Sequence, residues 1–190
     1  MPLCDVHLLK RPCRVRGLSL IELMVTLSIL AVLGALAAPS FTNMAERMRV
    51  SAVTDELVAS INLTRAEAIQ RNGAVGMTRL TGTGCPSLPS ADVWSCGWQV
   101  FVDTNRNGSK ASTEPTLQMF RITSGVNVVH SRSGVDTFTA NRWGQVAGIN
   151  AFGFVVSPAV TGVSSKATRT VCVNSGGRVR ILENSVTCTN

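Results

Sequence analysis

The chain is short of the residues that most enzymes and many binding surfaces use. It has no tyrosine, 5% aromatic residues and two histidines among its 190 residues. So few histidines leave little material for acid–base chemistry or a zinc site, and so few rings argue against a surface of stacked aromatics. The sequence also lacks a nucleophile elbow, a P-loop and a metalloprotease helix. We therefore expect a protein that is not an enzyme, with no cofactor, no metal and no small-molecule substrate.

Charged residues are also scarce, at 15% of the chain. A disordered chain needs the opposite balance, so most of this chain is able to bury apolar surface. The charge is uneven, because 18 basic and 11 acidic residues give a net charge of +7 at pH 7. This excess is compatible with an anionic partner, either nucleic acid or a membrane surface.

An apolar segment follows a basic N-terminus. Residues 1–17 hold four basic residues and one acidic residue, and residues 18–38 are apolar apart from one glutamate and three hydroxyl residues. A membrane-spanning helix needs about 20 residues of this kind, and the basic residues would keep its front end in the cytoplasm. A secretory signal begins in the same way, and the alanines before Pro39 imitate its cleavage site, so composition alone leaves both interpretations open.

Glu22 is the one charged residue inside that segment. A carboxylate at the centre of a membrane costs roughly 2.5–3.5 kcal/mol, so Glu22 is a functional candidate in need of a cationic partner. Residues 16–23 read R-G-L-S-L-I-E-L, which resembles the class III signal of type IV pilins and pseudopilins, although Phe is commoner than Leu at position 18. The resemblance implies that prepilin peptidase cuts between Gly17 and Leu18, that Leu18 is N-methylated, and that Glu22 pairs with the N-terminal ammonium of a neighbouring subunit. The alternative is a plain single-span anchor.

Removal of such a leader lowers the net charge from +7 to +4 and removes two cysteines. The cysteines that remain are Cys85, Cys96, Cys172 and Cys188. Local pairing, Cys85 with Cys96 and Cys172 with Cys188, is the simplest of three connectivities, and a periplasmic domain is able to form both bridges. Free thiols or a single bridge are the alternatives.

The periodicity of the chain predicts an α+β layout. One helix is expected over about residues 19–71, with Pro39 able to kink or end it and Arg71-Asn72-Gly73 as its stop. Its apolar stripe comprises Phe41, Met44, Met48, Val53, Leu57 and Ile61. Beyond Gly73, short alternating runs predict antiparallel strands. They lie near residues 75–81, 98–103, 117–122, 126–131, 137–141, 151–156, 167–173 and 178–182.

Residues 57–72 (L-V-A-S-I-N-L-T-R-A-E-A-I-Q-R-N) and 96–108 (C-G-W-Q-V-F-V-D-T-N-R-N-G) look like the FimT/GspH family of minor pilins and pseudopilins. The resemblance implies a type IV pilin-like fold, with a long N-terminal helix packed on the antiparallel β-sheets of a C-terminal globular domain. It divides the chain into a cleaved leader (1–17), a hydrophobic transmembrane or fibre-core half-helix (18–44) and a periplasmic globular domain (45–190), whose amphipathic half-helix ends at about 72. The implied location is the inner membrane, single-pass, and then the pilus, among other pilins.

Positive charge gathers late in the chain, where residues 121–190 hold seven basic and two acidic residues. There G-R-V-R at 177–180 looks like the G-R-x-R motif of DNA-binding FimT-type minor pilins, which capture DNA for natural transformation. The resemblance assigns non-specific DNA binding to Gly177, Arg178 and Arg180, and charge alone adds Lys166, Arg169 and Arg142.

On one strand, Arg178 and Arg180 would point outward about 7 Å apart, close to the spacing of phosphates, while Val179 and Ile181 face the core. Gly176 and Gly177 would leave the backbone open to close approach.

The alternatives to a DNA-binding minor pilin are a GspH-like pseudopilin of type II secretion and a minor pilin that acts only in pilus assembly or adhesion.

Two further features favour structural roles. Residues 103–114 fit the spacing of a calcium loop, but Val100 and Val102 before it alternate like a strand, and Asn107-Gly108 is a strong hairpin signal. We therefore expect a hairpin turn there. His130 ends an apolar run without a catalytic companion in the sequence, and we expect it to be structural or exposed.

Overall fold

The computed structural model describes residues 17–82, 84–85, 88–123, 125–146 and 151–188, and for residues 35–40 it describes the backbone alone. The described residues form two compact units, the first ending at Phe41 and the second beginning at Thr42. The predicted leader, apart from Gly17, lies outside the described residues.

Helix α1 (Leu20–Gln70) is 51 residues long and continues through Pro39, so the proline does not end it. The Oγ of Ser19 caps the first turn by accepting the amide of Glu22 at 3.2 Å. The predicted stop is confirmed, because Asn72 and Gly73 have positive φ values of 58° and 94° and the amide of Gly73 donates to Ala68 O at 2.7 Å.

Two four-stranded antiparallel sheets make up the rest of the second unit. The first has the order β3-β2-β1-β5, with β1 Val75–Arg79, β2 Gly97–Val102, β3 Thr116–Arg121 and β5 Thr137–Ala140. The second has the order β4-β6-β7-β8, with β4 Val126–His130, β6 Phe152–Pro158, β7 Arg169–Val173 and β8 Val179–Glu183. A one-turn helix, Gly162–Ser164, connects β6 and β7. The predicted α+β class is thereby confirmed.

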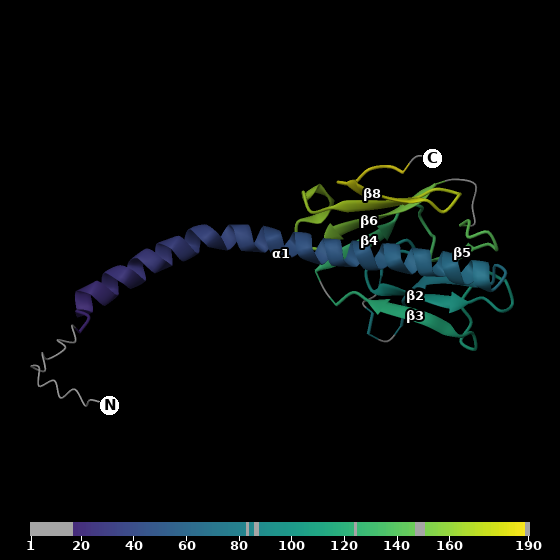
Figure 1. The fold of residues 1–190 in the computed structure, drawn as a ribbon, viewed down its shortest axis with the longest axis horizontal. Coiled ribbons are helices and arrows are strands. Elements are labelled where there is room, and N and C mark those ends of the chain that lie inside the picture. The colour runs from purple at the N-terminus through teal and green to yellow at the C-terminus, as the bar shows by residue number, and fades with distance from the viewer. Residues whose placement is uncertain (1–16, 83, 86–87, 124, 147–150, 189–190) are drawn as a thin grey trace, which may run out of the picture. The chain divides into compact units, whose positions relative to one another are not determined.

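The core lies between the C-terminal half of α1 and the two sheets, and Figure 1 shows this half of the helix running across both. Val50, Leu57 and Ile61 of α1 are fully buried with residues from both sheets. A polar contact joins the helix to the first sheet, because Trp98 Nε1 donates to Ser60 Oγ at 2.9 Å. Such a contact satisfies two buried polar groups at once.

The predicted apolar stripe of α1 is partly wrong. Val53, Leu57 and Ile61 are buried, but Met44 and Met48 are 54% and 59% exposed. The face of α1 that meets the sheets runs back from Ile61 through Leu57 and Val53 to Val50, and a 3.6-residue period carries it past positions 46–47 rather than 44 and 48. Phe41, 70% exposed, belongs to the first unit.

Candidate functional site

The residues predicted for processing and assembly lie at the start of α1. Gly17 and Leu18 precede the helix, and the side chain of Leu18 is exposed. Glu22 lies in the first turn, where the positive end of the helix dipole favours a carboxylate. Neither ion pair among the described residues involves Glu22. Its pairing with another subunit stays a prediction.

The large apolar side chains between Leu18 and Leu33 are exposed to between 50% and 77%. Within the described part of the chain, no helix combines the length and the apolar character that crossing a membrane requires.

The predicted DNA-binding motif lies at the turn between β7 and β8. The Asn174 Oδ1 accepts the amide of Arg178 at 2.8 Å, and the amide of Gly177 donates to Asn174 O at 2.8 Å. Arg178 and Arg180 are both exposed, and neither belongs to the ion pairs found among the described residues. Arg178 at the turn and Arg180 on the strand that follows it therefore present two guanidinium groups to solvent, and hydrogen bonds fix the backbone of the turn.

The structure corrects the expected strand geometry around this motif. Arg178 precedes β8, which begins at Val179. Ile181 is 48% exposed, although its position in the strand pattern predicts that it faces the core. The reason is that β8 is the edge strand of its sheet, and of its side chains Val179 is the one that packs against the core cluster.

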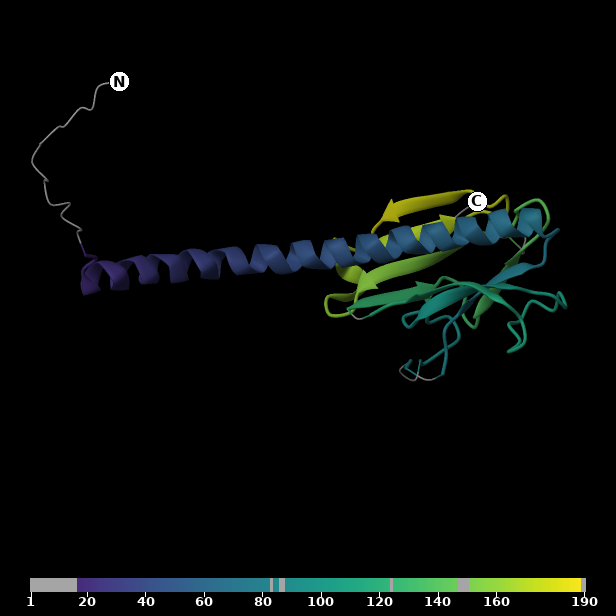
Figure 2. The same ribbon diagram turned by 60° about the horizontal axis from the view of Figure 1, so that its bottom comes forward.

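Gly177 is buried and lies against Arg65 and Gly144, so it does not face open solvent. Its φ of +80° favours glycine, and an added Cβ would meet the guanidinium of Arg65 and lie 2.7 Å from Gly144 O. The Arg65 Nε donates to the same Gly144 oxygen at 2.7 Å. The missing side chain of Gly177 therefore admits Arg65 of α1, not a ligand, and Figure 2 shows the β7–β8 hairpin beside the C-terminal half of α1. The sequence reasoning missed Arg65.

The loop after β5, residues 141–145, lies against this turn through Gly144. The Asn141 Oδ1 accepts the amides of Trp143 and Gln145, each at 3.0 Å, and its Nδ2 donates to Gln145 Oε1 at 2.9 Å. Arg142 is exposed, and its guanidinium carbon lies 5.3 Å from the centre of the Trp143 ring, a cation–π distance. The low aromatic content gave no hint of Trp143, which is 70% exposed.

Lys166 and Arg169 lie at the other end of the β7–β8 ladder. Arg169 pairs with Glu183 in the strand register, and its guanidinium lies 3.8 Å from the Glu183 carboxylate. Lys166 is exposed and lines a small cavity with Glu46 and Arg47 of α1. Five residues of strand span roughly 13–16 Å, so Lys166 and Arg169 lie away from the turn. Arg142 lies in the loop that adjoins the turn through Gly144.

The segment 103–114 is the connection of the β2–β3 hairpin, as expected. Asp103 is 3% exposed, and its carboxylate accepts the amides of Asn107 at 3.1 Å and Gly108 at 2.9 Å. Glu114 accepts the amides of Thr104 and Ala111. The amide of Ala111 is the main cause of a lowered pKa at Glu114, opposed by burial. Both carboxylates thus hold the loop's own backbone.

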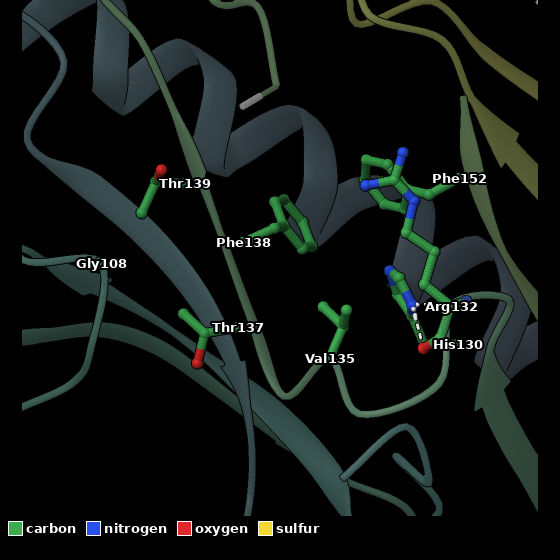
Figure 3. A pocket seen from close by; sticks show the side chains of 8 residues that line it. All are labelled: Gly108, His130, Arg132, Val135, Thr137, Phe138, Thr139 and Phe152. Atoms are coloured by element: carbon green, nitrogen blue, oxygen red, sulfur yellow. Dashed lines mark hydrogen bonds between the residues drawn. The ribbon is translucent and has the colours of Figure 1, made fainter. Parts of the chain in front are cut away.

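His130 lines a cavity of about 310 Å³ with Arg132, Phe138 and Phe152. Figure 3 shows His130, Arg132 and Phe152 on one side and Thr137 and Thr139 on the other, with Phe138 between them. The imidazole is 3% exposed, stacks on Phe152 at 5.1 Å between ring centres, and its Nδ1 accepts the amide of Arg132 at 3.0 Å. Burial lowers the pKa of His130. His130 therefore packs in an aromatic cluster, which is a structural role.

Disulfides join Cys85 to Cys96 and Cys172 to Cys188, with Cα–Cα distances of 5.5 and 5.4 Å. The first bridge closes the irregular loop before β2. The second ties the segment after β8 back to β7. The local pairing expected from the sequence is the one that the structure contains.

The sequence matches two family models and one curated protein. Residues 53–177 match the family described as Type II transport protein GspH, and residues 13–38 match the prokaryotic N-terminal methylation motif. The chain is 36% identical over 93 residues to the pilin-like protein PilA1 of Thermus thermophilus, covering 48% of this chain and 51% of that protein. It therefore spans about half the length of this curated relative.

The fold is similar to that of the type IV minor pilin FimU of Pseudomonas aeruginosa in two crystal forms. The TM-scores are 0.52 and 0.54 at 16% identity, and the matches cover 70% and 72% of this chain and 91% and 90% of FimU. A long N-terminal helix, two antiparallel sheets and a methylation motif define a type IV pilin-like protein. The chain belongs to the GspH family.

Proposed function

We propose that the protein is a minor pilin of a type IV pilus that binds DNA without sequence preference, for uptake in natural transformation. The observation that carries the proposal is the β7–β8 turn, where Arg178 and Arg180 are exposed and free of the ion pairs found in the described residues. The contact between Arg65, Gly144 and Gly177 fixes this turn against α1. The protein acts by binding and assembly, not by catalysis.

Guanidinium groups suit this task because they donate in a planar fork to phosphate oxygens. The net charge of +5 over residues 121–190, which follows from seven basic and two acidic residues, adds long-range attraction for a polyanion. Contacts of this kind position a protein on DNA but do not read its sequence. The proposed binding is therefore salt-dependent and non-specific.

Processing and assembly follow the same proposal. Prepilin peptidase cuts between Gly17 and Leu18, Leu18 is N-methylated, and Glu22 pairs with the N-terminal ammonium of the adjacent subunit. The match to the methylation motif over residues 13–38 supports this order of events. The segment 18–44 serves as inner-membrane anchor before assembly and as part of the fibre core afterwards, while the globular domain lies in the periplasm.

A second candidate function is that of a pseudopilin in type II secretion, with protein partners only. The description of the matched family favours it. The two functions differ in one measurable property, since a pseudopilin of this kind has no need to bind DNA.

The test is a gel-shift titration of the full chain in mild detergent with duplex DNA at several salt concentrations. The double variant Arg178→Gln/Arg180→Gln is compared with Arg47→Gln/Arg49→Gln, which removes the same charge from exposed positions on α1. The slope of log affinity against log salt becomes shallower by about 0.9 for each phosphate that the protein no longer neutralises. We expect a slope roughly 1.8 shallower for the first variant and a nearly unchanged slope for the second.

Equally weakened binding in the two variants would show that net charge, not the turn, drives binding. Wild-type protein that binds no duplex DNA at low salt would refute the proposed function and leave the pseudopilin alternative.

A further inference from the structure

Trp143 is an exposed tryptophan in a chain whose other two tryptophans are fully buried. Its exposed fraction is 70%, against 0% for Trp94 and 1% for Trp98. A large aromatic side chain gains from burial, so a ring left in water beside a functional surface calls for a binding partner.

The backbone of the loop that carries the ring is ordered by hydrogen bonds. Asn141 organises the loop through the two amides and the Gln145 side chain that it binds, and the amide of Gly144 donates to Asn141 O at 2.9 Å. Gly144 is itself buried against Ile69 of α1. A loop whose backbone is already ordered loses little conformational entropy when a ligand binds to it.

The same loop adjoins the arginine-bearing turn. Gly144 O accepts the Arg65 Nε and lies 2.7 Å from where a Cβ on Gly177 would be. Arg178 directly follows Gly177 in the chain. The guanidinium carbon of Arg142 lies 5.3 Å from the centre of the Trp143 ring. The ring therefore has one guanidinium over it, and the loop that carries the ring adjoins the turn that carries Arg178.

These neighbours identify the kind of partner. A protein partner needs an apolar patch. The residues beside Trp143 in the chain are Asn141, Arg142, Gly144 and Gln145, and the exposed apolar side chain shown against this loop is Ile69 of α1, so the loop adds little apolar surface of its own. An aromatic ring with one guanidinium over it, in a loop beside an arginine-bearing turn, suits a nucleobase joined to phosphates. Proteins bind single strands by stacking bases on aromatic rings within a basic groove.

We propose that Trp143 is a stacking platform for an unpaired nucleobase, so that the site takes a single strand or a frayed end of DNA while Arg142, Arg178 and Arg180 contact its phosphates. This inference rests on the proposed DNA binding and deepens it by naming the form of DNA. A duplex with closed ends offers phosphates to the arginines but no free base to Trp143.

The test uses the intrinsic fluorescence of the full chain in mild detergent, where stacking quenches Trp143 but leaves the buried Trp94 and Trp98 unchanged. Oligo-dT of about a dozen nucleotides is titrated against a duplex closed by hairpins at both ends. We expect quenching by oligo-dT alone. Trp143→Ala is expected to lose roughly tenfold in affinity for oligo-dT, within the range of one stacked base, and little for the closed duplex, while Trp143→Phe keeps most of the affinity.

The controls separate this inference from the proposed function. An unchanged melting temperature for Trp143→Ala shows that the exposed ring is not needed for folding. If oligo-dT binds without quenching and Trp143→Ala binds it as tightly as wild type, the stacking role is refuted even though DNA binding stands. If wild type binds neither probe, the proposed function fails and the stacking role fails with it. If Trp143→Ala disturbs self-association and leaves DNA binding intact, the ring is a subunit contact and the inference is overturned.

Discussion

Replacing Gly177 with alanine tests whether the β7–β8 turn is packed against α1 as the structure has it. The added Cβ would meet the Arg65 guanidinium and lie 2.7 Å from Gly144 O, while the backbone holds a φ of +80°. The side chain of Arg65 is able to shift, but the carbonyl of Gly144 belongs to a loop held by its own hydrogen bonds. The variant therefore meets backbone strain and a backbone clash together.

The two effects have separate magnitudes. An alanine in the left-handed region costs about 1–2 kcal/mol, and overpacking a tight site costs typically 1–3 kcal/mol. Their sum gives a destabilisation of roughly 2–5 kcal/mol. At about 2–4 °C per kcal/mol for a chain of this size, the melting temperature is expected to fall by roughly 4–20 °C.

Two other glycines provide matched controls in the same chain. Gly134 has a φ of +75° with nothing within 4 Å of an added Cβ, so Gly134→Ala measures the strain alone. Gly176 has no positive φ, and the nearest atom to an added Cβ would be Asn174 Oδ1 at 3.5 Å. Gly176→Ala therefore introduces neither backbone strain nor a clash. Thermal unfolding of the full chain, followed by near-ultraviolet circular dichroism of the buried tryptophans, ranks the three variants.

The expected order of destabilisation is Gly177→Ala, then Gly134→Ala, then Gly176→Ala. If Gly177→Ala and Gly134→Ala have the same melting temperature, the turn is not packed against Arg65 and Gly144, and the structural basis of the proposed site is wrong. The double variant Arg65→Ala/Gly177→Ala should recover only part of the stability, because Gly144 O and the φ remain.

Three further changes have defined outcomes. Asp103→Asn keeps one acceptor for the two amides that the carboxylate holds, so it is expected to lower the unfolding free energy by about 1–3 kcal/mol, measured in urea. Cys172→Ser/Cys188→Ser opens a loop with a sequence separation of 16 and should cost about 3 kcal/mol, also measured in urea. Burial lowers the pKa of His130 below its ordinary value of 6.5, so the unfolded chain binds its proton first, and stability should fall as pH drops below about 6.5.

Each of these has its own control. Calcium should not raise the stability of wild type, and a calcium-dependent rise would contradict the role of Asp103 as a backbone acceptor. Reducing agent should destabilise wild type to the level of the cysteine variant plus the contribution of the first bridge, and no effect of reductant would contradict the bridges. His130→Gln should flatten the pH dependence of stability on the acid side of about 6.5, and an unchanged profile would mean that another group titrates there.

Strands β4 and β5 were predictable because their positions alternate between buried and partly buried. Residues 126–131 and 137–141, expected as strands, correspond to β4 Val126–His130 and β5 Thr137–Ala140. The helix boundaries followed from local signals too, since Ser19 and Gly73 are capping residues whose partners lie within five positions. Features that depend on residues close together in the chain, such as helix caps, can be read directly from the sequence.

The arrangement around the turn was not predictable, because its contacts join distant parts of the chain. Arg65 and Gly144 are 79 positions apart, and nothing in a single sequence states that they meet. Ile181 was misplaced for the same reason, since burial on β8 depends on which strand lies at the edge of the sheet. A loop such as Asn141–Gln145 does show a turn signal, but its position beside Gly177 is a property of the tertiary fold.

The bridge between Cys172 and Cys188 has a mechanical consequence. Edge strands such as β8 peel away from a sheet by breaking one hydrogen bond after another under tension. Here β8, with Arg178 and Arg180, lies inside a covalently closed loop anchored on β7. If those arginines hold DNA as proposed, a pulling force on the DNA is shared by the peptide chain on both sides of β8. The disulfide keeps the strand attached to β7 even when its hydrogen bonds have opened.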